Sequence, residues 1–183
     1  VLEDVFPPIF AKYGTYHVAS TAPFKRIPFT EAMETYGSDK PDLRIDLTVQ
    51  DATDLLGGCG FEPFAGSVVK AVVVSDFTAT RKQIDWADVE VQAGSKPYWF
   101  RLDENGEIVG GISKFVSPIK EQVTASLGLQ ANCFVGLTAG KRGAAQKTAG
   151  VLRSKLGALC PNHMDKERYE FCWIVDFPMY EIG

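Results

Sequence analysis

YGSDKPDLR, at residues 36–44, places four charges of alternating sign within nine residues. A short helical pattern over residues 30–36 precedes it, and Thr30 can accept a hydrogen bond from an otherwise unpaired N–H as the N-cap of that helix. Gly37 suits the position just beyond the helix, where a left-handed backbone carries no Cβ penalty. Pro41 disfavours a helical conformation at the residue before it. The stretch therefore predicts a stiff, charged loop, for which an ordinary turn with capping side chains is the alternative.

The segments after this loop predict strands as well as helices. Residues 68–74 are rich in valine, as expected for a short buried strand. An Asn-Gly pair at residues 105–106 separates two extended runs, and this dipeptide is the strongest short hairpin signal. Residues 141–159 carry apolar residues at steps of four and three, which indicates the longest helix. Because a hairpin requires antiparallel pairing, we expect an α+β fold with helices on one face of an antiparallel or mixed sheet, and a parallel α/β sheet is the alternative.

The remaining elements are predicted from weaker patterns. They are helices over residues 1–13, with a break or restart at Pro7 and Pro8, over residues 48–56, over residues 80–94 and through residues 123–127, the last stopped by Gly128. Strands are predicted over residues 61–64 and 171–176. Thr48 is the expected N-cap of the second of these helices. The last strand is apolar enough to be buried on both faces.

The composition is that of an ordinary globular protein. The chain is 45% hydrophobic and 23% charged, with a net charge of −4, which excludes a simple basic nucleic-acid-binding protein and argues against a disordered tail. No apolar run is long enough to span a bilayer, and the acidic start is unlike a signal peptide, so we expect a cytoplasmic protein without a membrane partner. The four cysteines lack C-x-x-C spacing and the two histidines lack partners at recognisable spacing, so neither a metal site nor a His-based triad is predicted.

Residues 136–141, GLTAGK, superficially resemble a phosphate-binding loop. That loop needs four residues between its glycines and a Ser or Thr after the Lys, whereas this stretch has three, followed by Arg142. We therefore interpret it as a turn into a helix. Along that helix, Arg142 and Arg153 fall on one edge of the apolar stripe and could face RNA phosphates, although a solvated helix face is the simpler interpretation.

Residues 31–33, EAM, followed by YGSDKPDLR, resemble the signature of bacterial-type aspartyl-tRNA synthetases. Residues 80–85 resemble a helix start in the insertion domain of that family. Residues 173–181 resemble the strand that returns from the insertion to the catalytic sheet. The resemblance covers most of the chain, from around Ile27 to the end.

The resemblance implies three parts: a partial catalytic-domain flank at residues 1–60, a two-layer α+β insertion (the GAD domain) at residues 61–169, and a returning strand at residues 170–183. Members of the family join aspartate to tRNA through an aspartyl-adenylate, with ATP and magnesium, and are homodimers. In the family, the motif 2 arginine precedes this region, and the substrate-reading histidines and motif 3 arginine follow it. The resemblance therefore implies a fragment of an aspartate–tRNA ligase, with tRNA and the remainder of the synthetase chain as partners. We expect no catalytic, substrate-binding or metal-binding residue in it and no activity from it alone.

Two sets of residues are nevertheless candidates for a functional role. The loop residues expected near the rim of the active site are Ser38, Asp39, Lys40 and Arg44, and the residues that could face RNA are Arg142 and Arg153. The expected role is that of a non-catalytic insertion that shapes this rim or the approach of tRNA. The alternatives are an accessory module that binds tRNA or another RNA by itself, and a structural spacer without a ligand.

Overall fold

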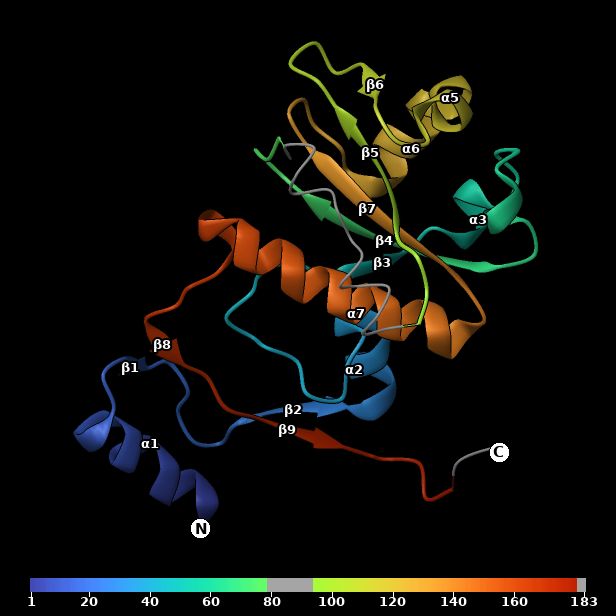
Figure 1. Cartoon of the computed structure of the whole chain (residues 1–183). Helices are drawn as coiled ribbons and strands as arrows, with labels where there is room; N and C mark the ends of the chain where they lie inside the picture. The colour runs from blue at the N-terminus through green and yellow to red at the C-terminus, as the bar shows by residue number, and fades with distance from the viewer. Residues whose placement is uncertain (79–93, 181–183) are drawn as a thin grey trace.

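A five-stranded antiparallel sheet forms the centre of the computed structural model, which describes residues 1–78 and 94–180 (Figure 1). In spatial order its strands are β3 (Val49–Asp51), β4 (Val68–Val74), β7 (Phe134–Gly140), β5 (Tyr98–Leu102) and β6 (Ile108–Val109). Strands β4 and β7 pair along their full length, from Val68 opposite Gly140 to Val74 opposite Phe134. The prediction of an α+β fold with an antiparallel sheet is confirmed.

Helices cover both faces of this sheet, because side chains along β4 point alternately to two apolar cores. Val72 and Val74 face a core that is closed by the long helix α7 (Arg142–Leu159). Val69 and Ala71 face a second core. That core is closed by α3 (Thr53–Leu56), α5 (Ser113–Val116) and α6 (Lys120–Leu127), together with the 3-10 turns η1 (Glu62–Phe64) and η2 (Ser117–Ile119). The shorter helices therefore add a layer on the face that the sequence pattern had left without helices.

Three local predictions agree closely with the structure. The Asn-Gly pair forms the turn between β5 and β6, where the carboxylate of Asp103 accepts hydrogen bonds from the backbone of Asn105 and Glu107. Helix α6 ends at Gly128, which has a left-handed backbone. Helix α7 buries the predicted apolar stripe and ends just before the 3-10 turn η3 (Pro161–His163).

Other local predictions are wrong. Residues 48–56 contain strand β3 followed by the single turn of α3, rather than one helix capped by Thr48, because Val49 and its neighbours pair with β4. Residues 62–64 form η1 rather than a strand, since the proline in its first turn suits a tight helical start. The helix expected over residues 80–94 lies, except for its last residue, outside the described part of the chain.

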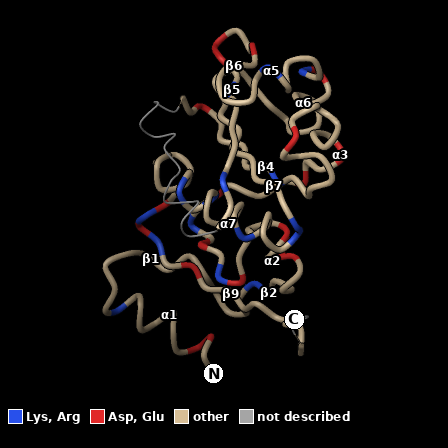
Figure 2. Tube along the Cα trace, turned by 45° about the vertical axis from the view of Figure 1, so that its right-hand side comes forward, with Lys and Arg blue, Asp and Glu red and all other residues tan. Residues whose placement is uncertain are grey.

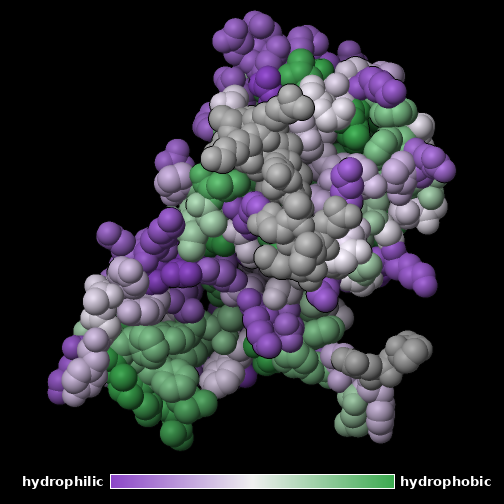
Figure 3. Space-filling view, in the orientation of Figure 1, coloured by the Kyte–Doolittle hydropathy of each residue, from purple (hydrophilic) through white to green (hydrophobic). Residues whose placement is uncertain are grey.

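Helix α1 (Leu2–Tyr13) is continuous through Pro7 and Pro8, so the predicted break is wrong. A proline inside a helix costs about 3 kcal/mol, and α1 contains two, while aromatic packing on one side of the helix acts in the opposite direction. The rings of Phe6 and Phe10 contact Phe171, with centroids 5.9 and 5.1 Å apart. The outward face of α1 stays apolar and exposed, and it forms the largest hydrophobic area in Figure 3.

Two short parallel pairs join the beginning of the chain to its end. Strand β1 (His17–Val18) pairs with β8 (Arg168–Tyr169), and β2 (Lys25–Pro28) pairs with β9 (Cys172–Val175). Strand β9 is half-buried, rather than buried on both faces as predicted, because β2 is its partner in a sheet of only two described strands. No helix among the described residues is long and apolar enough to cross a membrane.

Candidate functional site

The stretch predicted as a charged loop, residues 36–44, starts with the last residue of helix α2 (Phe29–Tyr36), and the helix ends as expected at Gly37 with φ +67°, so the loop itself spans residues 37–44. The helix begins one residue before Thr30, with Pro28 in the N-cap position and no capping side chain. The prediction of Thr30 as N-cap is therefore wrong. A left-handed conformation is disfavoured for residues with a Cβ atom, so glycine at position 37 lets the chain leave α2 sharply and turn toward α7.

The loop is held in shape by its own charged residues. The guanidinium of Arg44 donates to both carboxylate oxygens of Asp42, at 2.9 and 2.7 Å, and its backbone N–H donates to the same carboxylate at 3.1 Å. These bonds from Arg44 lower the pKa of Asp42, against an opposing effect of burial. The hydroxyl of Ser38 accepts a bond from the backbone N–H of Lys40. The loop therefore has one defined shape rather than a set of loose charges.

Helix α7 touches the start of this loop through backbone atoms. A Cβ atom built on Gly150 would lie 2.2 Å from the carbonyl oxygen of Gly37. A Cβ atom on Gly37 would lie 2.4 Å from the backbone of both Gln146 and Gly150. These separations are shorter than any van der Waals contact, so glycine is required on both sides. Two glycines thus let the loop and the helix approach as closely as backbones can.

Arg153, one turn further along α7, holds the end of the loop. Its side chain is 1% exposed, and it donates from Nε to the carbonyl of Leu47 at 2.5 Å. Nη2 donates to the carbonyls of Asp42 and Ile45 at 3.0 and 2.7 Å. Burial lowers the pKa of Arg153. The guanidinium is therefore enclosed by protein. A residue that binds RNA phosphates has to be exposed, so Arg153 lacks the exposure that this role needs.

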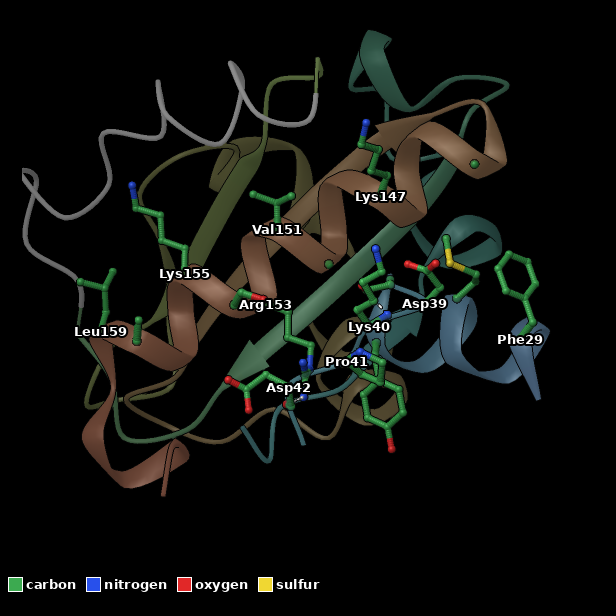
Figure 4. A pocket seen from close by; sticks show the side chains of 18 residues that line it. Phe29, Asp39, Lys40, Pro41, Asp42, Lys147, Val151, Arg153, Lys155 and Leu159 are labelled. Atoms are coloured by element: carbon green, nitrogen blue, oxygen red, sulfur yellow. Dashed lines mark hydrogen bonds between the residues drawn. The ribbon is translucent and has the colours of Figure 1, made fainter. Parts of the chain in front are cut away.

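An open groove of about 910 Å³ lies between α2, the loop and the outer face of α7 (Figure 4). Three of the predicted rim residues line it, namely Ser38, Asp39 and Lys40. Lys147 and Lys155 line it from α7, and in Figure 4 their side chains extend away from the helix. The fourth predicted rim residue, Arg44, pairs with Asp42 instead. The structure thus brings three predicted residues together along one wall of a groove.

A second charged cluster includes Glu34 in the last turn of α2, close to the start of the charged loop, and the sequence reasoning missed it. Lys70, in the middle of β4, is 1% exposed, and its ammonium donates to Glu34 at 2.6 Å and to Asp51 at 2.8 Å. Glu34 also pairs with Arg142 and accepts a bond from Gln146. Figure 2 shows segments of both charge signs interspersed around α2 and α7, rather than one basic face.

The cluster gives Arg142 a structural partner, although its side chain is 71% exposed. The ion pair with Glu34 joins the first turn of α7 to α2, the helix that carries the charged loop. The signal that could have revealed the cluster was a lysine within a run of valines. A buried strand rarely accepts such a charge without a partner.

The cluster predicts a loss of stability in acid. Burial alone would raise the pKa of Asp51, but hydrogen bonds from Lys70 and Thr53 outweigh it and lower the pKa from 3.8 to about 2. A carboxylate with a depressed folded pKa stabilises the fold above its unfolded pKa, and this contribution is lost as pH falls through the folded pKa. We expect the free energy of unfolding to fall between about pH 4 and pH 2, and to fall less in Asp51→Asn. Urea unfolding across this range measures both, and equal slopes would contradict the prediction.

The comparison with known proteins agrees with the loop sequence. The family described as tRNA synthetases class II (D, K and N) matches residues 1–181. The chain belongs to this family. An aspartate–tRNA ligase of Streptomyces avermitilis is 41% identical over 98% of this chain. An aspartate–tRNA(Asp/Asn) ligase of Zymomonas mobilis is 38% identical, and an aspartate–tRNA ligase of Streptococcus suis is 37% identical, each over the same share.

This class II synthetase chain is much shorter than those relatives. It covers 32% of the Streptomyces avermitilis protein, 31% of the Zymomonas mobilis protein and 32% of the Streptococcus suis protein, or about a third of each. The matched third includes both features that form the groove, the charged loop and helix α7. The site is therefore part of the region that these synthetases share with the chain.

Proposed function

We propose that the chain is a non-catalytic part of an aspartate–tRNA ligase, in which it supplies an insertion domain and the loop at the rim of the active site. The observation that supports this most is the seating of the loop at residues 37–44 on α7, with Ser38, Asp39 and Lys40 along an open groove. In this proposal the insertion comprises residues 61–169, and residues 1–60 and 170–183 adjoin the catalytic domain. Its long helix supports a loop that belongs to the neighbouring catalytic part.

The complete ligase would activate aspartate with ATP and then transfer it to tRNA, as a homodimer. Charge that builds on the α-phosphate in such chemistry is stabilised by arginines and magnesium. Within residues 1–78 and 94–180, no group of three or more His, Cys, Asp and Glu side chains could hold a metal ion. We therefore assign no step through magnesium to this chain, and its proposed contribution is to place the loop.

Aspartate-dependent exchange of pyrophosphate into ATP tests the proposal. We expect exchange from the complete gene product that contains this chain, and none above background from the 183-residue chain alone. Omission of aspartate and its replacement by asparagine are the controls. Clear exchange by the 183-residue chain would contradict the non-catalytic role. Absence of exchange by the complete, folded gene product would contradict the assignment to a ligase.

A second candidate function, binding of RNA by the chain itself, is supported by the composition of α7. The helix contains no Asp or Glu, and it presents Lys147 and Lys155 to the groove. Contacts with phosphates release counterions, so such binding weakens steeply as salt rises. Binding of tRNA to the 183-residue chain at two salt concentrations distinguishes the candidates: tight, salt-dependent binding without exchange activity in the complete protein favours the RNA-binding module.

A further inference from the structure

Within the described residues, the hydrogen bonds that Arg153 donates go to one short segment of backbone. The three carbonyls that accept from it belong to Asp42, Ile45 and Leu47. More than 100 positions separate this segment from Arg153 in sequence. A guanidinium is planar, has five donors and stays charged at every ordinary pH. A single side chain of this kind can therefore fix several carbonyls that point in different directions.

A gain in stability does not by itself explain these bonds, because the burial of the charged guanidinium costs free energy. All three acceptors are neutral carbonyls, and the nearby carboxylate of Asp42 is already paired with Arg44. Burial of a charge costs free energy unless its partners compensate for the lost water. Apolar side chains of similar volume often stabilise such a site as well as buried charges do. The arrangement is therefore better explained by a need to fix the backbone in one position.

Contacts with α7 fix both ends of the loop and leave its middle open. Gly150 touches the backbone of Gly37 at the beginning, and Arg153 holds the carbonyls at the end. Residues three apart lie on the same face of a helix, so one face of α7 makes both contacts. Between them, Ser38, Asp39 and Lys40 border the groove. Their positions depend on how the two ends are held.

We propose that Arg153 is a positioning residue, which fixes residues 37–47, the charged loop together with the three residues that follow it, on α7 and so places Ser38, Asp39 and Lys40 at the rim of the active site. This inference rests on the proposed function for its catalytic consequence. Its structural part, the fixing of the loop, stands without it. The role differs from contact with RNA, because the guanidinium acts through backbone carbonyls and is enclosed. The long helix of the insertion thereby determines the geometry of a loop outside the insertion.

Hydrogen exchange on the 183-residue chain tests the fixing of the loop. We expect Arg153→Met to raise the exchange rates of the amides between residues 38 and 47 at least tenfold, and to change those in β4 and β7 less than twofold. Arg101→Met, at a site on β5, is the matched control and should leave the loop unchanged. Unchanged rates at residues 38–47 in Arg153→Met would overturn the proposal. A uniform rise throughout the sheet would also overturn it, because it would indicate general destabilisation.

Kinetics of the complete gene product test the consequence for activity. At a temperature where the variants are folded, we expect Arg153→Met to reduce kcat/KM for aspartate-dependent exchange at least tenfold and to change the KM for ATP less than threefold. Arg153→Lys keeps the charge but loses the planar fork, so it should restore only part of the activity. If Arg153→Met does not fold, hydrogen exchange is measured on Arg153→Lys instead. Faster exchange of the loop amides alone would support the proposal, and unchanged exchange rates in the loop would overturn it.

The two arms separate the failure of this inference from the failure of the proposed function. A loop-specific rise in hydrogen exchange, together with no exchange activity in the unsubstituted complete protein, would reject the ligase assignment and support the fixing of the loop. Normal activity of a folded Arg153→Met protein would overturn the positioning role and leave the ligase assignment intact.

Discussion

Replacement of Gly150 by alanine is expected to destabilise the chain by about 3 kcal/mol, although alanine is the better helix former. The added Cβ atom would lie 2.2 Å from the carbonyl oxygen and 2.7 Å from the carbonyl carbon of Gly37. Both are backbone atoms, which cannot rotate away as the end of a side chain can. Relief of the clash requires the loop to separate from α7, and that separation strains the three bonds of Arg153.

Gly143→Ala is the matched control for this substitution. Gly143 lies in the first turn of the same helix, and a Cβ atom there would meet nothing within 4 Å. Loss of backbone freedom in the unfolded chain makes this change stabilising by about 0.5–1 kcal/mol. Urea unfolding of both variants measures the difference. A similar stability for Gly150→Ala and Gly143→Ala would show that the loop does not rest on the helix backbone.

The second large effect is expected from removal of both carboxylates around Lys70. Lys70 is 1% exposed, whereas its partners Glu34 and Asp51 are 35% and 57% exposed. The double change Glu34→Gln with Asp51→Asn keeps the size and hydrogen-bonding ability of both side chains but leaves a buried ammonium without a counter-charge. An uncompensated buried charge destabilises by about 3 kcal/mol or more. Addition of Lys70→Met to this variant should recover most of that loss, because it removes the isolated charge.

The recovery of stability by Lys70→Met would show that the loss in the double variant comes from the unpaired charge. A matched control is the double change Glu31→Gln with Asp54→Asn, which neutralises two exposed acids on the same helix α2 and on α3. Surface changes of this kind stay within about 0.5 kcal/mol. Thermal and urea unfolding of the double variant, of the same variant with Lys70→Met and of the control, each measured against the unsubstituted chain, give the comparison. Failure of Lys70→Met to improve the double variant would mean that the cluster does not depend on pairing of the buried charge.

Local patterns predicted the parts of the fold that local chemistry determines. Glycine at position 37, the Asn-Gly turn and the valine-rich strand β4 each depend on neighbours in sequence, and each is confirmed. The predictions over residues 48–56 and 61–64 failed because pairing with β4 and the proline of η1 outweighed weak local preferences. Chain patterns also do not show what packs on a sheet, so the second layer of helices was missed.

For the candidate site, too, the sequence predicted what neighbours in the chain determine and missed what tertiary contacts determine. The sequence placed Ser38, Asp39 and Lys40 in one loop, and these residues border the groove. It also placed Arg153 at the edge of the apolar stripe of α7, but helical spacing gives only the face of a helix and not its neighbour. Arg153 lies four positions after Ala149 and three before Leu156, both fully buried. That spacing was consistent with a buried arginine, and only the loop on the other side explains why one is needed.

The register of β2 and β9 has a consequence for how this family can vary. Lys25 lies opposite Cys172, and Pro28 lies opposite Val175, so the chain leaves at one end of a short parallel pair and comes back at its other end, only three residues away along the strand. Proteins tolerate foreign segments best where the two ends of the segment are close together. Evolution or an engineer can therefore trim, enlarge or replace the residues between these strands while the junction keeps its shape. A replacement that omits α7, however, would also need a new anchor for residues 37–47.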